Sequence, residues 1–300
     1  MGYSARYHAA SLAAVLLALA IGLLIGAGIG DEVLSSTSED LERSLEADLT
    51  ESREREDQLQ AELDREQTFG LRVYPALAGD RLRGETVGVV AIGDLPEELA
   101  SEIEATVDPT GGRLAKVAVV RQPPDLEDLS GELGARFRDL ESDGTEVERL
   151  GRKLGMQLVR GGGLLSAARE QLLERFSGQE RGVDNVIVVA RPPDGETEGD
   201  PGTANRFEEG VLEGIRSVGR PAVGVELRST EPSTIPIFES HDIPTSDSLD
   251  LTSGKIATVF ALLGAEGNFG VKESADALLP DVVLEPEEGA GDARRGRRPE

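Results

Sequence analysis

Three consecutive residues, Ser240, His241 and Asp242, carry the side-chain types of a hydrolytic triad. In such a triad the base takes a proton from the nucleophile while the acid orients the base, so all three must be hydrogen-bonded in series. Side chains of adjacent residues point apart, and we therefore expect no triad here. His241 and Asp242 are instead candidate metal ligands, although a single histidine in a loop is usually just solvated.

Two glycine-containing stretches match phosphate-binding motifs only in part. The segment "LTSGKIAT" at 251–258 ends like a phosphate loop, but Leu249 stands where that motif requires its first glycine. The segment "AIGDLPEEL" at 91–99 has one glycine where a dinucleotide motif requires three. The sequence also lacks a GxSxG nucleophile elbow. We therefore predict that the protein is not an enzyme and holds no cofactor.

The amino-acid composition of the chain excludes several classes of binding partner and site. The chain has 300 residues, with 57 acidic and 31 basic side chains and a formal net charge of −26. Such a surface repels nucleic acid and anionic lipid headgroups, so neither is expected to bind the bulk of the chain. The chain has no cysteine, which excludes disulfides, thiolate metal sites and cysteine nucleophiles.

Four runs rich in valine and isoleucine predict buried strands separated by helices. This alternation predicts an α/β domain at 69–284, with a mostly parallel sheet of four to five strands and helices on both faces. The runs are 85–96, 113–124, 183–193 and 220–229, followed by a short fifth candidate, "TIPIF", at 234–238. Helices are predicted near 96–107, 125–140, 145–159, 164–176, 207–218 and 252–264.

The loops at the carboxyl ends of these strands are the expected functional loops, because ligands bind at that edge of a parallel sheet. They are Gly93-Asp94, Gln122-Pro123-Pro124, Arg191-Pro192-Pro193 and Arg228-Ser229. Beyond the domain, the tail at 285–300 is rich in glycine and charged residues, and its composition predicts disorder.

The amino-terminal segment predicts a single transmembrane helix. Residues 9–29 carry no charge, and at about 1.5 Å rise per residue they span a hydrocarbon core of roughly 30 Å. The apolar region of a signal peptide is shorter, at about 7–15 residues, which favours an anchor that is retained. Arg6 precedes the span, and Asp31 and Glu32 follow it, so we expect residues 1–8 in the cytoplasm and the body outside.

Small residues recur at every fourth position of this span. Residues four apart lie on one face of a helix, and a ridge without large side chains lets two helices approach closely in lipid. Alternatively, alanine and glycine are simply common in this segment. Our hypothesis is that the ridge associates copies of the chain into a homo-oligomer through Ala10, Ala14, Ala18, Gly22, Gly26 and Gly30.

Residues 31–68 are highly charged and lack proline and glycine, which predicts a helical stalk. Leucines stand at 34, 41, 45, 49, 59 and 63, so a coiled-coil seam would be interrupted near Ser52 to Glu56. Two interpretations stay open. The stalk is either a solvated helical spacer or a parallel coiled coil that continues the ridge of the membrane helix.

Both ends of the chain resemble a known family. The opening "YHAASLAAVLLALAIGLLIGAGIGDEVL" with its charged stalk and "LRGETVGVVAIGD", and the closing run at 245–281 with its turn Asn268-Phe269-Gly270, are similar to actinobacterial copper transporters called MctB. The resemblance covers residues 3–281. It implies a role in copper efflux or tolerance, a place in the cell envelope and a channel across the outer membrane.

The residues themselves qualify what the resemblance implies. Copper(I) prefers thiolate and thioether ligands, yet the chain has no cysteine and only two methionines, Met1 and Met156. Met156 lies in a predicted helix, where a packing role is expected. We therefore expect a copper-efflux protein without a dedicated high-affinity copper site, with copper as the transported ion. The alternative is a non-catalytic envelope scaffold that presents an α/β module to unidentified envelope proteins.

The ridge hypothesis gives a first prediction. Replacing Gly22 and Gly26 by isoleucine places branched side chains on the ridge and should lower self-association of the isolated membrane segment. A membrane reporter assay of helix association measures this. An unchanged signal in the double variant would exclude the ridge as the interface.

Overall fold

The computed structural model describes residues 3–124, 126, 144–192 and 201–281, and gives the backbone alone for residues 3–6 and 27–43. The helix expected at 125–140 and the tail at 285–300 lie outside the described residues. The chain forms two compact units, Met1–Glu66 and Gln67–Glu300, and each is described by itself.

The described part of the first unit is one continuous helix. It belongs to α1 (Tyr3–Ala78), whose last residues lie in the second unit. Residues Tyr7–Gly26 are long and apolar enough to cross a membrane, and their side chains are exposed. This candidate span begins and ends two to three residues before the expected 9–29. The helix continues through the expected stalk, where the leucines at 45, 49, 59 and 63 are exposed, and the coiled coil stays a prediction.

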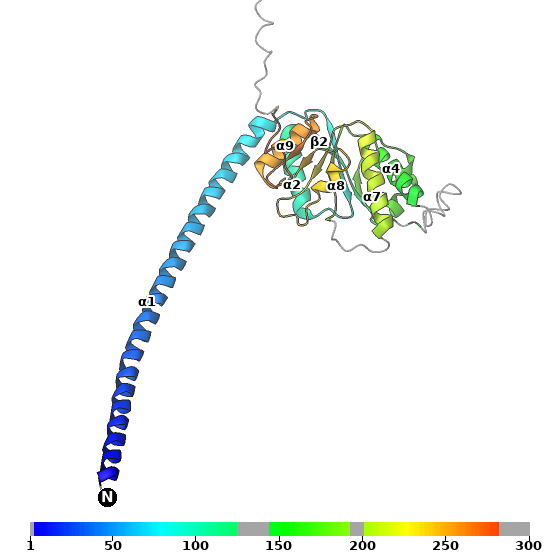
Figure 1. Ribbon diagram of the computed structural model, residues 1–300. Coiled ribbons are helices and arrows are strands. Elements are labelled where there is room, and N and C mark those ends of the chain that lie inside the picture. The colour runs from blue at the N-terminus through cyan, green and yellow to red at the C-terminus, as the bar shows by residue number, and fades with distance from the viewer. Residues whose placement is uncertain (1–2, 125, 127–143, 193–200, 282–300) are drawn as a thin grey trace, which may run out of the picture. The chain divides into compact units, whose positions relative to one another are not determined.

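The second unit contains one mixed sheet of seven strands among the described residues (Figure 1). The strand order is β3-β2-β1-β4-β5-β6-β7, and β3 runs antiparallel to β2 while the other neighbours are parallel. The strands are β1 (Thr86–Ile92), β2 (Arg113–Val120), β3 (Leu173–Gly178), β4 (Asn185–Val189), β5 (Ala222–Val225), β6 (Thr245–Ser246) and β7 (Asn268–Phe269).

Helices cover both faces of the sheet, as expected. The residues of α2, α9 and the end of α1 share one buried apolar cluster with the sheet, and those of α4 and α7 share the other. Figure 1 shows α4 and α7 side by side. The helices of this unit are α2 (Glu97–Val107), the 3₁₀ turn η1 (Asp108–Thr110), α4 (Gly144–Arg160), α5 (Gly163–Ala167), α6 (Arg169–Leu172), α7 (Pro201–Ser217), α8 (Ile235–Glu239) and α9 (Thr252–Leu262).

Three details of the sheet differ from expectation, and the prediction of four to five strands was wrong. The segment predicted as a helix at 164–176 forms α5 and α6 and then turns into β3, a sheet-edge strand whose mostly exposed, polar residues give little strand signal. The strands β6 and β7 have two residues each, too few to show a period of two. The run "TIPIF" forms α8, with Pro236 in its first turn, where proline favours a helix.

Side-chain alternation in the central strands explains why they read as continuous apolar runs. In β1, Val90 and Ile92 join the cluster beneath α4 and α7, while Val87 and Val89 join the cluster beneath α2 and α9. Each of these side chains is buried. A strand with helices on both faces has no polar face, which is the arrangement expected of a parallel sheet.

Helices α4 and α7 meet through glycines on both sides of their contact. On α4, a Cβ atom at Gly151 would lie 2.3 Å from the carbonyl oxygen of Phe207, and one at Gly155 would lie 2.1 Å from that of Val211. These distances are far below contact, so the backbone of α7 occupies the space that larger side chains on α4 would need.

The glycines of α7 face the backbone of α4 in the same way. On α7, a Cβ at Gly210 would lie 2.1 Å from the carbonyl oxygen of Glu148, and one at Gly214 would lie 2.2 Å from that of Arg152. Each helix therefore carries two glycines four residues apart, and the two pairs face each other's backbone. The same spacing of small residues occurs in the apolar amino-terminal helix, but these two glycine pairs were not predicted from the sequence.

A lysine lies inside the core beneath these helices. Lys116 in β2 is 2 % exposed, and its Nζ donates a hydrogen bond of 2.8 Å to the carbonyl oxygen of Leu158. That carbonyl belongs to the last turn of α4, where backbone oxygens have no partner within the helix. Burial lowers the pKa of Lys116 to about 8, and the carboxylate of Glu180 opposes this change.

The glycine contact predicts that Gly155→Ala destabilises the domain. The methyl group would overlap the backbone of Val211, and overpacking of this kind costs about 1–3 kcal/mol of unfolding free energy. Urea unfolding of the full chain, read by pulse proteolysis, measures the change. Gly163→Ala is the matched control, because a Cβ at Gly163 meets open space. Equal stability of the two variants would contradict the close approach.

Lys116 predicts a dependence of stability on pH. Because its pKa is about 8 in the folded chain and about 10.5 when unfolded, the unfolded chain binds more protons between these values. The unfolding free energy of the wild type should therefore rise relative to Lys116→Met as pH increases from 8 to 10.5, by on the order of 2–3 kcal/mol. Urea titrations of both proteins across this range test it. A flat difference between them would show that Lys116 has an ordinary pKa.

Candidate functional site

The strand order reverses beside β1, which makes the carboxyl edge of the sheet the first place to look for a site. Strand β2 lies on one side of β1 and β4 on the other. At such a switch point the connections leave in opposite directions, and a crevice opens outside the strand ends. The expected loop residues Gln122 and Arg191 follow β2 and β4 and do lie at this edge.

A hollow of about 330 Å³ occupies this position, and we call it the switch-point hollow. The start of α7 and the end of α8 complete its wall. It is lined by Gln122, Arg191, Pro192, Pro201, Asn205, Glu208, Glu209, Leu212, Ile237, Ser240 and His241. It therefore combines two residues predicted from strand ends with His241, the predicted metal ligand.

Gln122 and Glu208 are half-buried and form a polar pair in the wall of the hollow. The amide Nε2 of Gln122 donates a hydrogen bond of 2.8 Å to Oε2 of Glu208. The remaining oxygens, Gln122 Oε1 and Glu208 Oε1, are buried and have no hydrogen-bond partner among the described residues. Burial raises the pKa of Glu208, while the hydrogen bond from Gln122 and the nearby Arg191 and His241 lower it.

The ring of His241 is held by its Nδ1 atom. This atom lies 2.9 Å from the carbonyl oxygen of Ile237 and 2.9 Å from Oγ of Ser240. A carbonyl oxygen only accepts, so in the neutral ring Nδ1 carries the proton and Nε2 carries the lone pair. The Ser240 hydroxyl donates to the same carbonyl at 2.7 Å.

Ser240 and His241 do make contact, although the side chains of adjacent residues were expected to point apart. The series of hydrogen bonds that a triad requires still stops at His241. Among the described residues, no hydrogen bond joins the side chains of Asp242 and His241, and Asp242 has a positive φ of 53°. The serine proton is directed at a carbonyl, so the arrangement lacks the geometry of a triad.

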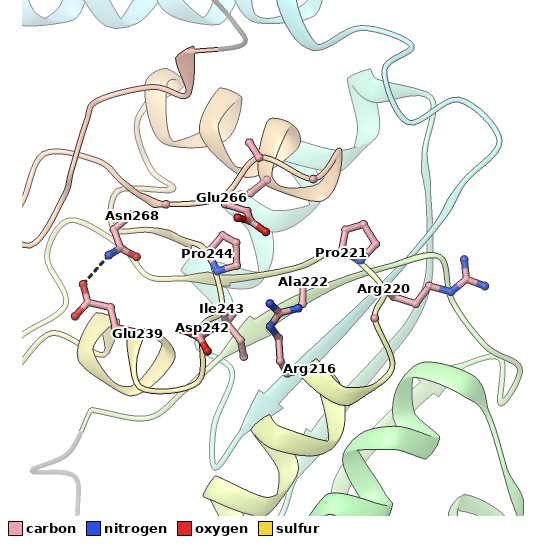
Figure 2. Close-up of a pocket in the computed structure, with 15 residues that line it drawn as sticks. Arg216, Arg220, Pro221, Ala222, Glu239, Asp242, Ile243, Pro244, Glu266 and Asn268 are labelled. Atoms are coloured by element: carbon pink, nitrogen blue, oxygen red, sulfur yellow. Dashed lines mark hydrogen bonds between the residues drawn. The ribbon is translucent and has the colours of Figure 1, made fainter.

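A second hollow adjoins the switch-point hollow through shared residues, and a third hollow adjoins the second. The second, of about 530 Å³, shares Glu209, Ser240 and His241 with it and is also lined by Glu148, Glu213, Arg216 and Asp242. The third, of about 720 Å³, shares Arg216 and Asp242 with the second and lies at the amino ends of β5 and β6. Figure 2 shows the third hollow, with Asn268 bonded to Glu239 at 2.9 Å.

The predicted metal ligands His241 and Asp242 both line the second hollow. Among the described residues, however, no group of three or more histidine, cysteine, aspartate or glutamate side chains is placed to hold a metal ion. A metal role for this pair stays a prediction.

The stretch resembling a phosphate loop is used for packing. Lys255 is buried, and its ammonium group pairs with Glu102 on α2. A Cβ at Gly254 would lie 2.0 Å from the carbonyl oxygen of Ser248, so this glycine allows α9 to begin against the preceding loop. These contacts agree with the interpretation of the stretch as a helix entry.

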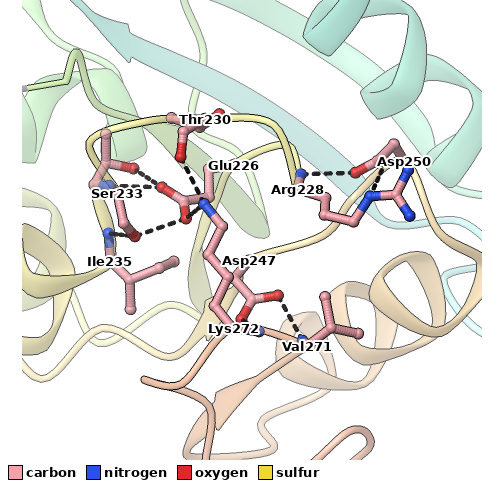
Figure 3. Close-up of polar contacts among 10 residues, drawn as sticks. Glu226, Arg228, Thr230, Ser233, Ile235, Asp247, Asp250, Val271 and Lys272 are labelled. Carbon is pink, nitrogen blue, oxygen red and sulfur yellow. Dashed lines mark hydrogen bonds and ion pairs between the residues drawn. The ribbon is translucent and has the colours of Figure 1, made fainter. Parts of the chain in front are cut away.

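The closing run of the chain is fixed by buried acidic residues at the ends of β5 and β6 (Figure 3). Glu226 accepts hydrogen bonds from Thr234 and Ser233 and pairs with Lys272 at 2.6 Å. Asp247 accepts the backbone N–H groups of Val271 and Lys272, each at 2.8 Å. Because these oxygens have their donors within the chain, we interpret this cluster as structural.

Sequence reasoning missed Asn205 and Glu208 of the switch-point hollow. Neither lies in a strand-end loop or a motif; both lie on α7. The sequence does contain a signal for these residues. A helix that follows a parallel strand starts at the carboxyl edge of the sheet. Polar residues in its first two turns therefore lie close to the strand ends.

A match to one protein family covers most of the chain. No curated protein matches the sequence. The model of a protein family described as "Copper transport outer membrane protein, MctB" matches residues 3–280. The match includes the apolar helix, the sheet and the closing run with its buried acidic cluster. The chain therefore belongs to the MctB family.

Proposed function

We propose that this protein acts in copper efflux and homeostasis as a membrane-anchored protein of the cell envelope. The observation that carries the proposal is the family match over residues 3–280, since the family is described by copper transport and by a membrane. The candidate span Tyr7–Gly26 supplies an anchor of the right length.

The proposed topology follows from the charges beside the anchor. Arg6 precedes the span, and Asp31 and Glu32 follow it. Basic residues stay on the cytoplasmic side, so the amino terminus faces the cytoplasm and the α/β body lies outside. In this position the acidic surface of the body meets ions that have left the cytoplasm.

Within this function, the chain has no dedicated high-affinity copper site of its own. A copper(I) site needs soft sulfur ligands, and the described residues offer one methionine, the half-buried Met156 on α4. The acidic hollows attract cations more weakly, because their carboxylates are partly solvated. Copper is then a transported ion and no resident cofactor.

The proposal requires more than one chain. A single helix encloses no path, so transport needs either several copies or a partner. Copies would associate through the ridge of Ala14, Ala18, Gly22, Gly26 and Gly30 and through the stalk. The exposed leucines of α1 at 45, 49, 59 and 63 fall into two pairs in the same heptad positions, which suits a parallel partner helix.

The adjoining hollows along α7 and α8 favour a second candidate function. They form a partly polar surface on the body, and their contacts show no catalytic arrangement among the described residues. A non-catalytic scaffold would use such a surface to bind other envelope proteins. Under this alternative, the loss of the protein would disturb a complex and leave copper levels unchanged.

A deletion strain separates the two functions. We expect deletion to lower copper tolerance and to raise intracellular copper, and full-length protein to restore both. A form lacking residues 9–29 should fail to restore them, because the body loses its anchor. Normal tolerance and normal copper content after deletion would contradict the copper function.

A pull-down from membranes with the full-length protein tests the scaffold function. Recovery of a specific envelope partner together with normal copper tolerance would favour the scaffold. Absence of any envelope partner would count against it.

A further inference from the structure

We propose that two copies of the chain pair along residues 45–66 of α1, parallel and in register, and that charged residues of the stalk determine this arrangement. The inference rests on the proposed function, in which copies associate through the stalk. It adds the orientation, the register and the residues that set them. Residues 45–66 belong to one uninterrupted helix and contain no proline or glycine (Figure 1).

Four exposed leucines form a seam along this helix, which we call the leucine seam. Leu45 and Leu59 lie two heptads apart, and so do Leu49 and Leu63. The step of four residues within each pair places Leu45 and Leu59 at position d of a heptad and the other two at position a. Their side chains are between 42 % and 62 % exposed. A second helix laid against the seam would remove them from water.

Charges beside the leucine seam complement one another when two copies run parallel. In a parallel pair, position g of one helix faces position e of the next heptad on the other helix. Asp48 is at g and Arg53 is at e, so each copy's Asp48 faces the other's Arg53, twice by symmetry. Neither side chain forms an ion pair with another described residue. The remaining contacts of this kind join a charged residue to a glutamine and are Arg55–Gln60 and Glu62–Gln67.

An antiparallel pair meets like charges instead. With the same leucines aligned, Leu45 would lie opposite Leu63 of the other copy, and g would face g while e faced e. Arg53 would then face Arg53, and Arg55 would face Arg55. Asp48 would face the carboxylate of Glu62. Because like charges held this close destabilise a helix pair, the charges of the stalk select a parallel second copy.

A polar layer within the leucine seam sets the register. Glu56 occupies position a, and in register its side chain fits a hole bordered by Ser52 and Arg55 of the other copy. The two arginines offset the two carboxylates of this layer. A shift by one heptad would lay Glu56 against Leu49 or Leu63, and burying a carboxylate against leucine is costly. The interruption of the seam near residues 52–56 therefore acts as a register signal.

Arg55 is available for this contact. In the single chain it pairs with Glu51 one turn earlier, and both side chains are more than 60 % exposed. Exposed ion pairs contribute little to stability, so Arg55 exchanges this partner for the layer of Glu56 at small cost.

The positions that flank the seam favour two copies over a larger bundle. In a two-helix coiled coil the e and g side chains keep contact with water, whereas each added helix buries more of them. Here these positions are mostly charged, so a larger bundle would desolvate many charges. They are Glu46, Asp48, Arg53, Arg55, Gln60 and Glu62. Anchors in one membrane raise the effective concentration of the copies, which helps a short seam to pair.

Disulfide crosslinking of full-length variants in membranes tests the pairing, because the chain has no cysteine of its own. Leu45→Cys and Ser52→Cys each place one thiol at position d, and Ser52→Cys keeps all four leucines. Ala47→Cys is the matched control, at position f on the opposite face. After diamide oxidation without copper, we expect at least fivefold more dimer on a non-reducing immunoblot for both d variants than for the control. Equal yields would overturn the seam, and linkage of Ser52→Cys alone would overturn the parallel register.

Charge variants in the Leu45→Cys background test the orientation. Arg53→Glu turns the contact with Asp48 into a repulsion and should lower the dimer yield at least fivefold. Asp48→Arg together with Arg53→Glu reverses the pair and should restore the yield to within twofold of the parent. The control is Arg65→Glu, the same charge change at position c, which should leave the yield unchanged. An unaffected yield in Arg53→Glu, or no rescue by the double variant, would contradict the assignment.

This experiment fails separately from the copper function. Crosslinking needs no copper, so specific linkage of the d variants together with normal copper tolerance in the deletion strain would overturn the copper function alone. Unspecific linkage together with lowered copper tolerance after deletion would overturn the stalk pairing alone.

Discussion

The contact between α4 and α7 is the constraint on which the placement of the body's main surface depends. Four glycines, at 151, 155, 210 and 214, bring the two backbones so close that a single methyl group would overlap a carbonyl oxygen at each position. Packed interiors tolerate such overlap poorly, so the axial position of α7 against α4 is fixed to within a fraction of a turn. Everything that α7 carries is fixed along with it.

What α7 carries is one wall of all three hollows. Its first turns hold Asn205 and Glu208 against the ends of β2 and β4, and its last turn holds Arg216 beside the starts of β5 and β6. The partner wall comes from α8 and the residues after it, including His241. The half-buried pair of Gln122 and Glu208 is therefore positioned by the contact that the glycines of the same helix make with α4. Stability and site geometry therefore share one determinant.

The sequence was informative where burial is continuous and uninformative where structure is short or polar. The four valine-rich runs became β1, β2, β4 and β5, because strands covered on both faces must be apolar at every position. The edge strand β3 and the two-residue β6 and β7 have no such requirement, and "TIPIF" is apolar in either conformation. The residues of the site were likewise predictable only in part. Strand-end residues such as Gln122 follow from topology, but Glu208 depends on how far α7 advances along α4, which only the packed structure specifies.

The family description refers to an outer membrane, and the described part of the chain restricts what it can contribute there. Both faces of the sheet are covered by helices, so its strands are occupied by the core and have no face left for lipid. Among the described residues, Tyr7–Gly26 is the segment suited to the hydrocarbon layer, and one helix encloses no path. We therefore expect the body to meet an ion through its partly solvated carboxylates, which exchange cations readily. A surface of that kind suits transient contact with an ion, and tight storage of copper(I) would need more sulfur ligands than the two methionines of this chain provide.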